Sequence, residues 1–283
     1  MAESIAAIVV TYNRLELLQE TIESLLHQSR VPDEIIVINN SSTDGTLAWL
    51  ESQTGISIVT QPNIGGAGGF ATGMKHAFDK GYDWIWCMDD DVVPMKDCLE
   101  HLISFKSQSL IRAPYRFEAD SNALPQDTLE FNFTNPFKSL WKRMFTTNDL
   151  HGESILAVGL TFEGPLIHRT VIEKIGLPEA RFFIFADDSD FFIRAFMNGF
   201  NSIIIFSARM ERKIPYVIRK SAPWKAYYEL RNIILLDMRY GSFWVKLLRP
   251  IYYWYKSIIR AKDSATRKRL LRGFIDGITQ KLE

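Results

Sequence analysis

The 283-residue chain has few cysteines and no long apolar run, and both absences narrow what it can be. Cys87 and Cys98 are its two cysteines, too few for a disulfide framework, which favours a reducing compartment. No stretch approaches the roughly 18 uninterrupted apolar residues of a membrane-spanning helix, and no basic segment followed by an apolar one opens the chain. We therefore expect a cytoplasmic protein without a standard secretion signal or a membrane span.

The sequence also lacks net charge, but its charges are unevenly distributed. Residues 1–204 hold 15 Lys and Arg against 27 Asp and Glu, whereas residues 205–283 hold 18 against 6. The body is thus acidic and the tail basic, which favours an anionic surface as a partner of the tail. Because 47% of the residues are hydrophobic, the chain can still bury a large core.

The most informative stretch, residues 82–94, reads YDWIWCMDDDVVP. An apolar segment of strand length ends there in three carboxylates, Asp89, Asp90 and Asp91, which cannot lie in a core. We expect them at the end of a strand, at the edge where open parallel α/β sheets bind ligands. Hard carboxylate oxygens at positions i and i+2 suit Mg²⁺ or Mn²⁺ carrying a diphosphate. The alternative for a bare Asp triplet is a solvated acidic turn.

The first 95 residues predict four β-α repeats. Apolar runs at 5–10, 34–38 and 56–60 precede the strand that delivers the aspartates, and each is followed by a polar or glycine-rich loop and a helical pattern. This alternation predicts an α/β fold with a Rossmann-like, mostly parallel, doubly wound sheet, whose loops converge at one edge. The glycine-rich loop at 61–70 lacks the G-x-G-x-x-G spacing of a dinucleotide site. It is either a flexible turn or a backbone that lies close to a nucleotide-sugar.

A second acidic cluster follows a stretch of weaker pattern. From 110 to 156, aromatic residues alternate with prolines and polar residues, which predicts short strands and a mobile loop of the kind that forms lids or acceptor sites. Residues 182–190 then read FFIFADDSD, before apolar residues at helical spacing. Asp187 and Asp188 therefore lie at a helix N-terminus, where the helix dipole stabilises negative charge. Capping explains one of these acids, but not three in one turn.

Several motifs, in order over about 230 residues, resemble family 2 glycosyltransferases with the GT-A fold. They are VVTYNR at 9–14, VINNSSTDGT at 37–46, NIGGAGG at 63–69, the acidic triplet, Asp187-Asp188 followed by Arg194, and YELRN at 228–232. The glycine motif and the Tyr-x-x-Arg-Asn block are most similar to bacterial galactofuranosyl- and rhamnosyltransferases. The resemblance implies an inverting transfer of galactofuranose, or else rhamnose, from a UDP- or dTDP-sugar to a hydroxyl of a lipid-linked or cell-surface polysaccharide.

The resemblance also implies roles for single residues. Asp89 and Asp91 become the ligands of Mn²⁺ or Mg²⁺, which neutralises the leaving diphosphate. Asp188 becomes the general base that deprotonates the acceptor hydroxyl, with Asp187 as the alternative. The residues implied to hold the nucleotide-sugar are Thr11, Tyr12, Asn13, Arg14, Asn39, Asn63, Gly65, Gly66, Asp89 and Asp90.

Two positions depart from the family pattern. The family has Asp where this chain has Asn39, so recognition of the base has to use an amide. The family also has a His after the last sheet strand as a third metal ligand, but this chain reads IFSARM at 205–210. Neither Arg209 nor Met210 replaces an imidazole on a hard cation. Either two carboxylates, diphosphate oxygens and water hold the metal, or Arg209 contacts phosphate itself.

Residues 221–283 are expected to form a helical extension of a GT-A domain that spans residues 1–220. Residues 243–256 read FWVKLLRPIYYWYK, and aromatic residues beside bases are typical of a helix in the lipid headgroup layer. A helix packed on the body with a solvated basic face fits equally, whereas the dense apolar content argues against a nucleic-acid partner. We expect peripheral attachment to the inner face of the cell membrane, and the resemblance implies a glycan or polyprenyl-linked acceptor.

Two other classes of function stay open. A nucleotidyltransferase of the same fold needs a glycine-rich, basic loop after the first strand, which Thr11-Tyr12-Asn13-Arg14 does not supply. A non-catalytic glycan- or lipid-binding protein does not require both acidic clusters at one sheet edge. The enzymatic hypothesis therefore depends on geometry: Asp89 and Asp188 must face a common cleft.

Overall fold

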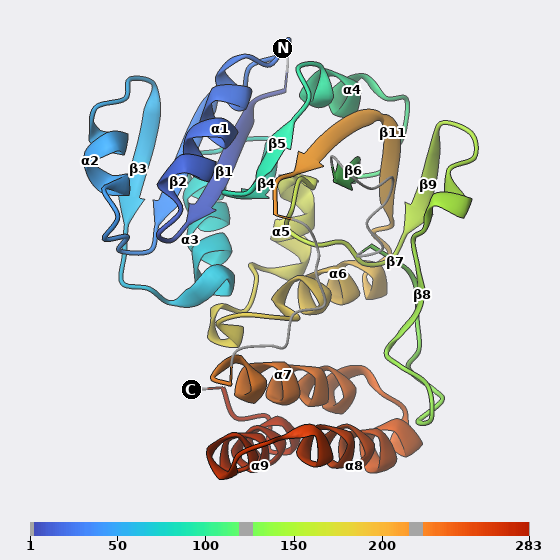
Figure 1. The fold of residues 1–283 in the computed structure, drawn as a ribbon. Coiled ribbons are helices and arrows are strands. Elements are labelled where there is room, and N and C mark those ends of the chain that lie inside the picture. The colour runs from blue at the N-terminus through green and yellow to red at the C-terminus, as the bar shows by residue number, and fades with distance from the viewer. Residues whose placement is uncertain (1–2, 119–126, 215–222, 283) are drawn as a thin grey trace.

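A mixed sheet forms the centre of the protein in the computed structural model, which describes residues 3–118, 127–214 and 223–282 (Figure 1). Within these ranges nine strands pair in the order β3-β2-β1-β4-β10-β6-β11-β5, and β9 pairs with β11. The strands of this sheet are β1 (Ile5–Thr11), β2 (Glu34–Asn39), β3 (Ile56–Thr60), β4 (Trp84–Asp89), β5 (Val92–Pro94), β6 (Ile111–Glu118), β9 (Ser154–Ala157), β10 (Leu166–His168) and β11 (Ser202–Arg212).

The predicted β-α repeats are confirmed in the first half of this sheet. Strands β1 to β4 pair in parallel. The helices that alternate with them, and the one that follows, are α1 (Leu15–Leu26), α2 (Thr46–Glu51), α3 (Gly65–Asp79) and α4 (Cys98–Ser104). In the other half, β10 runs antiparallel to β4 and to β6, so the sheet is mixed there.

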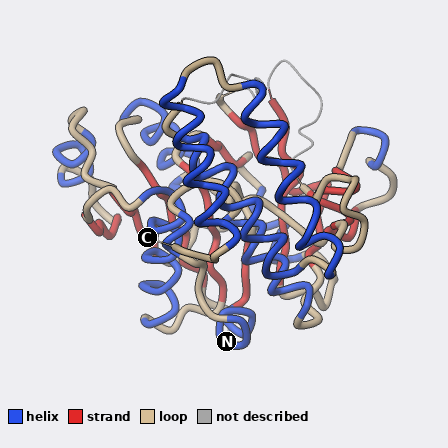
Figure 2. The backbone as a smooth tube through the Cα atoms, turned by 90° about the horizontal axis from the view of Figure 1, so that it is seen from below, coloured by secondary structure: helices blue, strands red, loops and turns tan. Residues whose placement is uncertain are grey.

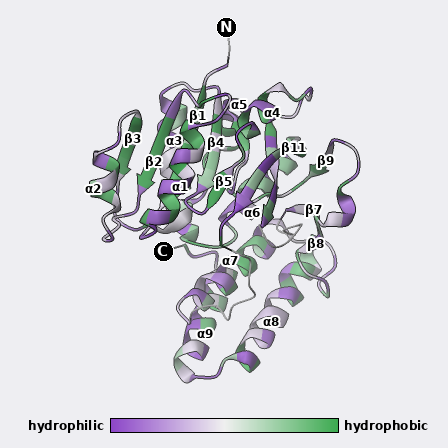
Figure 3. Ribbon diagram, turned by 45° about the horizontal axis from the view of Figure 1, so that its top comes forward, coloured by the Kyte–Doolittle hydropathy of each residue, from purple (hydrophilic) through white to green (hydrophobic). Residues whose placement is uncertain are grey.

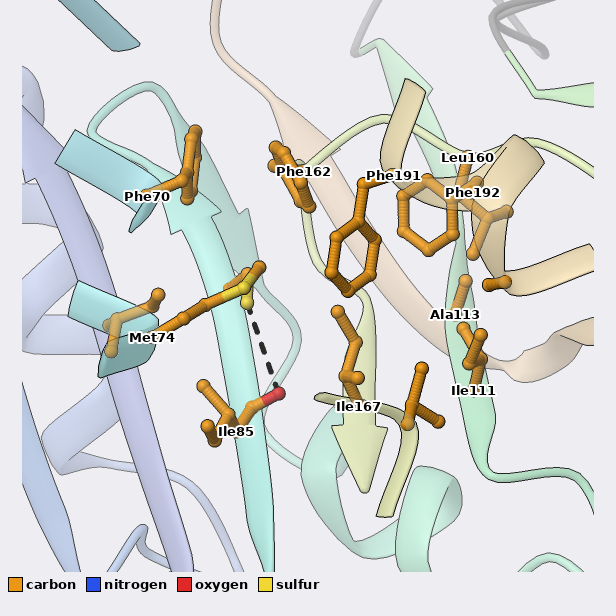
Figure 4. Close-up of a cluster of buried hydrophobic side chains, with 14 of the residues drawn as sticks. Phe70, Met74, Ile85, Ile111, Ala113, Leu160, Phe162, Ile167, Phe191 and Phe192 are labelled. Carbon is orange, nitrogen blue, oxygen red and sulfur yellow. Dashed lines mark hydrogen bonds between the residues drawn. The ribbon is translucent and has the colours of Figure 1, made fainter. Parts of the chain in front are cut away.

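Helices cover both faces of the sheet, because successive strand residues point to opposite faces. Ala6, Ile8 and Val10 of β1 pack into a cluster with α3, α5 (Arg169–Ile175) and α6 (Asp187–Met197). Figure 4 shows part of this layer, with the phenylalanines of α6 and Met74 of α3 over Ile85 and Ile111. The alternate residues of β1 pack into a second cluster with α1, α2 and α4. The doubly wound prediction is therefore confirmed.

Strand β6 lies inside the main sheet, although the weak pattern at 110–156 predicted only short strands and a loop. Its two arginines break the apolar run but are buried with partners. Arg112 donates to the carbonyls of Leu102 and Ile103, both at 2.8 Å. The rest of the stretch forms β9, a hairpin of β7 (Thr128–Phe131) and β8 (Trp141–Met144), and the 3₁₀ turn Thr147–Asp149. Residues 119–126 of the predicted loop lie outside the described residues.

The C-terminal part is helical, as predicted. Helices α7 (Lys225–Tyr240), α8 (Phe243–Arg260) and α9 (Ser264–Ile278) lie below the edge toward which β1, β2 and β3 point. Seen from below, long helices cross in front of the strands (Figure 2). No helix in the described ranges has the length and apolarity needed to cross a membrane.

Helix α7 packs on the body through a separate cluster of buried side chains. Leu235 and Leu236 share a cluster with Phe182, Ala186 and Ile193 of the body. The predicted boundary at residues 220 and 221 falls outside the described residues, and the first helix beyond it packs on the body through this cluster.

Candidate active site

Two adjoining cavities lie at the edge where β1 and β4 end, with volumes of about 800 and about 290 Å³. Both are bordered by Arg14, Gly66, Asp89 and Ile184. The larger cavity is further lined by Ala67, Phe70, Asp91, Thr128, Ser139, Trp141, Met144, Leu160, Thr161, Phe162, Glu163, Phe185, Ala186, Asp187, Asp188, Ser189 and Arg212. The smaller cavity is further lined by Val10, Thr11, Tyr12, Asn40, Asn63, Gly65, Asp90, Phe183, Trp224 and Lys225.

The two acidic clusters, about a hundred residues apart in the sequence, meet at the larger cavity. Asp89 lies at the end of β4 and Asp91 just beyond it, while Asp187 and Asp188 open helix α6. Strand ends and a helix start converge at this edge because the sheet is wound on both faces. The common cleft that the sequence required is therefore present.

Asp90, the middle member of the triplet, supports the loop after β1. Its Oδ2 accepts a 2.7 Å hydrogen bond from Thr11 Oγ1. Arg14 Nη1 lies 3.0 Å from Asp90 Oδ1 and 3.0 Å from Asp91 Oδ2, so one guanidinium bridges two acids. Burial raises the pKa of Asp90 and the charge of Arg14 opposes this shift. Asp90 borders the smaller cavity but is already bound to protein groups.

Asp89 and Asp91 have the features of a cation site. Asp91 Oδ1 is buried and has no hydrogen-bond partner among the described residues. Burial and the charge of Glu163 raise the pKa of Asp91 to about 6. Burial and the charge of Asp91 raise the pKa of Asp89 well above its usual value. Two crowded carboxylates with an unused oxygen fit Mn²⁺ or Mg²⁺, which take hard oxygen ligands.

A third protein ligand is missing from this pair in the described part of the chain, where no three His, Cys, Asp or Glu are grouped to hold a metal. Arg209, the alternative considered for a phosphate contact, stacks on Phe117 with its guanidinium carbon 4.6 Å from the ring centroid. Met210 is fully buried. Neither is among the described residues that line these two cavities, but Arg212, at the end of β11, lines the larger one. The cation that this strand brings to the site is therefore Arg212.

Asp188 is the more exposed member of the second acidic pair. Burial, together with the charge of Glu163, raises its pKa to about 6. Burial and the adjacent Asp188 carboxylate raise the pKa of Asp187 to about 8. Of the two carboxylates Asp188 has the smaller rise in pKa, and an ionised carboxylate is what a general base needs.

A buried ion-pair network supports the cavity wall between the two acidic clusters. Arg116 donates to Glu163 Oε2 and to Asp127 Oδ1, both at 2.6 Å, and Glu163 also lies 3.4 Å from Arg212 Nη2. Glu163 lines the cavity, and its charge acts on the pKa of Asp91 and of Asp188. Sequence reasoning missed these residues, because nothing in the local pattern links Arg116 to acids 11 and 47 positions away.

Most residues expected to hold the nucleotide-sugar border the smaller cavity, but two do not. Thr11, Tyr12, Arg14, Asn63, Gly65, Gly66, Asp89 and Asp90 line it. Asn13 and Asn39 are not among the described residues that line either cavity. The Asn13 amide oxygen instead accepts from Thr43 N at 2.7 Å, and the buried Asn39 accepts from Ser42 N at 2.9 Å. The neighbouring Asn40 faces the cavity in place of Asn39.

The glycine run allows close packing as well as an open cavity wall. Gly65 has φ +78, and a Cβ there would lie 2.0 Å from the carbonyl oxygen of Phe183. A Cβ on Gly69 would lie 2.4 Å from Cγ1 of Val10 in β1. Gly66 has no atom within 4 Å of its Cβ position and borders both cavities. These glycines thus let helix α3 approach β1 and the loop before α6.

Comparison with known proteins identifies the family. Residues 6–176 match the family model described as glycosyl transferase family 2. The chain belongs to glycosyl transferase family 2. The resemblance of its motifs is therefore confirmed, and the protein is a glycosyltransferase.

Two curated proteins named as galactofuranosyltransferases are similar to the chain in sequence. Galactofuranosyltransferase GlfT1 of Mycolicibacterium smegmatis is 30% identical over 207 residues, which cover 70% of this chain and 67% of that protein. GlfT1 of Mycobacterium tuberculosis is 28% identical over 215 residues, with coverages of 70% and 66%. The matched region thus spans about two thirds of the length of these glycosyltransferases.

Solved glycosyltransferase structures share the fold. GalNAc-T7, crystallised with UDP, GalNAc and Mn²⁺, has a TM-score of 0.68 at 11% identity, over 99% of this chain and 56% of that one. The mannosyltransferase PcManGT from Pyrobaculum calidifontis, in complex with GDP-Man and Mn²⁺, has a TM-score of 0.57 at 14% identity, over 98% and 87%. The predicted GT-A fold is confirmed.

Proposed function

We propose that this glycosyltransferase transfers galactofuranose from a UDP-sugar, or else rhamnose from a dTDP-sugar, to a hydroxyl of a lipid-linked or cell-surface glycan, with inversion. The observation that carries the proposal is the single cavity bordered by Asp89, Asp91 and Asp188. One acidic cluster binds the donor diphosphate through a metal, and the other activates the acceptor. The similarity to proteins named galactofuranosyltransferase supports the first choice of sugar.

The donor spans both cavities. The nucleoside occupies the smaller one, against Tyr12, Asn40 and Asn63. The diphosphate passes the shared border at Arg14 and Gly66, where a guanidinium and an open backbone meet. Asp89 and Asp91 would hold Mn²⁺ or Mg²⁺ there, and the ion would supply positive charge against the leaving diphosphate.

Asp188 is the proposed general base of a direct displacement. Its carboxylate takes the proton from the acceptor hydroxyl as that oxygen attacks the anomeric carbon. The bond between the anomeric carbon and the diphosphate oxygen breaks in the same step, and the nucleoside diphosphate leaves. A single in-line displacement inverts the configuration. Asp187 has the higher pKa and keeps its proton, which avoids two adjacent charges in the buried site.

The acceptor is proposed to enter along an aromatic wall of the larger cavity. Trp141 of β8 and Phe185, two residues before helix α6, lie edge to face with ring centroids 6.0 Å apart. Both line the cavity that holds Asp188. Aromatic faces bury the apolar side of a sugar ring while its hydroxyls stay hydrogen-bonded. This arrangement supports a glycan acceptor.

The outer surface of α8 and α9 is the proposed membrane contact, on the inner face of the cell membrane. Figure 3 shows hydrophobic and hydrophilic residues mixed along both helices. Exposed apolar residues form a stripe on α8, and exposed bases lie on both helices and, at Lys262, on the connection between them. The stripe consists of Trp244, Leu247, Ile251, Tyr255 and Ile259. The bases are Lys246, Lys256, Arg260, Lys262, Arg267, Lys268, Arg269 and Arg272. The bases can pair with anionic lipid headgroups, and the amphipathic aromatic side chains can lie at the level of these headgroups.

Sedimentation with vesicles tests the contact. The protein is expected to pellet with phosphatidylglycerol vesicles at low salt, less so at high salt, and poorly with phosphatidylcholine vesicles. The double variant W244E/Y255E should lose binding, whereas the control Leu26→Glu, at an exposed apolar residue of α1, should retain it. Equal binding of all three proteins would contradict the proposed surface.

A donor screen tests the reaction. Purified protein is incubated with UDP-galactofuranose or dTDP-rhamnose, a glycan acceptor and Mn²⁺, and the release of nucleoside diphosphate is measured. We expect UDP release that depends on the acceptor. Release of pyrophosphate from a nucleoside triphosphate and a sugar phosphate would indicate a nucleotidyltransferase instead, and no turnover with any sugar nucleotide would indicate a binding protein.

A further inference from the structure

The loop before α6 has an unusual backbone. Phe183, Phe185 and Ala186 have φ values of 65°, 72° and 66°, in the left-handed region that side chains other than glycine rarely adopt. Such a conformation persists only where its surroundings fix it, and it is commonly found at functional sites. The loop ends at Asp187 and Asp188, so its conformation sets where these carboxylates lie.

Two fully buried side chains of α7 hold this loop by its carbonyls. Arg231 Nη2 donates to the carbonyls of Arg181 and Phe182, both at 2.9 Å. Asn232 Nδ2 lies 3.1 Å from the Phe182 carbonyl and 2.8 Å from those of Ile184 and Phe185. Neither side chain has exposed surface. Together they contact the carbonyls of four residues in the segment 181–185.

The two side chains also orient each other. Arg231 Nε donates to Asn232 Oδ1 at 2.8 Å, which turns the amide NH₂ toward the loop. The Arg231 guanidinium carbon lies 5.0 Å from the ring centroid of Tyr228, and that ring stacks on Phe183 at 4.9 Å. The whole Tyr-x-x-Arg-Asn block, which the sequence resemblance left without a role, therefore faces one loop.

The opposite side of the loop rests on α3. The Phe183 carbonyl accepts a 3.2 Å hydrogen bond from Ala67 N and packs against Gly65. Phe183 and Ile184 border the smaller cavity, and Ile184, Phe185 and Ala186 border the larger one. The loop is thus held between two helices and forms part of both cavity walls.

We propose that Arg231 and Asn232 are positioning residues, which hold the left-handed loop so that Asp188 points at the acceptor hydroxyl. This inference rests on the proposed role of Asp188. Both side chains bind backbone carbonyls and act on the reaction through Asp188. Loosening the loop lowers the fraction of time in which the base and the hydroxyl are aligned, and it leaves the nucleotide contacts of β1 and β2 in place.

Arg231→Lys, with Arg112→Lys as a matched control, tests this proposal. Arg112 is also a buried arginine that donates to carbonyls, but it lies at the start of β6 and is not among the described residues lining the cavities. Both variants replace a planar guanidinium that donates hydrogen bonds to several carbonyls, so both should lower the melting temperature. Arg231→Lys should lower kcat about 10- to 100-fold, as a misplacement of about 1 Å does. The Kd for UDP and Mn²⁺ should rise by much less than this factor, because Phe183 and Ile184 are the loop residues that border the smaller cavity and the rest of its lining stays in place. Arg112→Lys should leave kcat unchanged.

The pH profile of kcat separates positioning from loss of stability. Arg231→Lys should move the midpoint of the acid limb, because the surroundings of Asp188 change, and Arg112→Lys should not move it. If Arg231→Lys does not fold, the smaller change Asn232→Ser, which keeps the Arg231 bonds to the loop, is measured instead. Unchanged kcat in the folded loop variant, or an equal loss of kcat in Arg112→Lys, overturns the proposal. If the proposed role of Asp188 itself is wrong, the result is different, because Asp188→Asn would then transfer the sugar at the wild-type rate.

Discussion

The pH dependence of turnover follows from the surroundings of Asp188. As the proposed base, Asp188 must be ionised to accept a proton, and burial with the charge of Glu163 raises its pKa to about 6. A raised pKa moves the acid limb of the profile to higher pH than an ordinary aspartate gives. The value of kcat/KM should therefore be flat near neutral pH, halve near pH 6, and fall about tenfold for each further unit of acidification.

Glu163→Gln perturbs this profile in a direction that the structure fixes. Removing the Glu163 charge removes a cause that raises the pKa of Asp188, so the midpoint should move to lower pH. Arg116 keeps its ion pair with Asp127 in this variant, which limits the loss of folding. The expected shift is a few tenths of a pH unit to about one unit.

Initial rates with saturating Mn²⁺ and donor over a range of acceptor concentrations, from about pH 5 to pH 8, give kcat/KM for the acceptor and so measure both profiles. Stability of each protein over the range is checked by dilution back to neutral pH. A wild-type profile that stays flat to pH 5, or a Glu163→Gln midpoint that moves to higher pH, would refute the reasoning about Asp188.

Two further predictions concern folding and the acceptor. Arg249→Met removes a buried ion pair with Asp237 and bonds to the Asn132 and Asn135 carbonyls. The substitution should lower the free energy of unfolding by about 3–5 kcal/mol, which is roughly 5–8 °C in Tm for a chain of this length. The control Lys75→Met, at an exposed ion pair, should change Tm by less than about 1 °C. Equal melting temperatures of the two variants in calorimetry would contradict this prediction. In steady-state assays Trp141→Ala should raise the acceptor KM about tenfold without changing the donor KM. The control Phe137→Ala, which removes an exposed aromatic residue before the same strand, should change neither KM. A rise in the donor KM alone would contradict the proposed stacking of the acceptor on Trp141.

The first half of the fold and both acidic clusters could be predicted from local pattern. Apolar runs of strand length that end in polar loops place Asp89 and Asp91 at a sheet edge, and helical spacing after Asp188 places it at a helix start. These inferences use residues near each other in the sequence, so no tertiary contact was needed to make them.

The parts that could not be predicted depend on distant partners or on a shift of one residue. Strand β6 is hidden because Arg112 and Arg116 break its apolar pattern, and their partners come from other elements. Asn40 lines the cavity instead of Asn39 because adjacent residues at a strand end point to opposite sides. Arg212 reaches the cavity because β11 continues past an irregularity between Ile205 and Arg209.

One acidic cluster is proposed to bind the donor, and the other to activate the acceptor in the same cavity. Calorimetry of UDP binding with and without Mn²⁺, combined with transfer rates, tests this proposal on Asp91→Asn and Asp188→Asn side by side. We expect Asp91→Asn to lose the Mn²⁺-dependent part of UDP binding. Asp188→Asn should bind UDP and Mn²⁺ like wild type and lose transfer by about a thousandfold or more. Transfer at the wild-type rate in Asp188→Asn, or unchanged Mn²⁺-dependent binding in Asp91→Asn, would contradict the proposal.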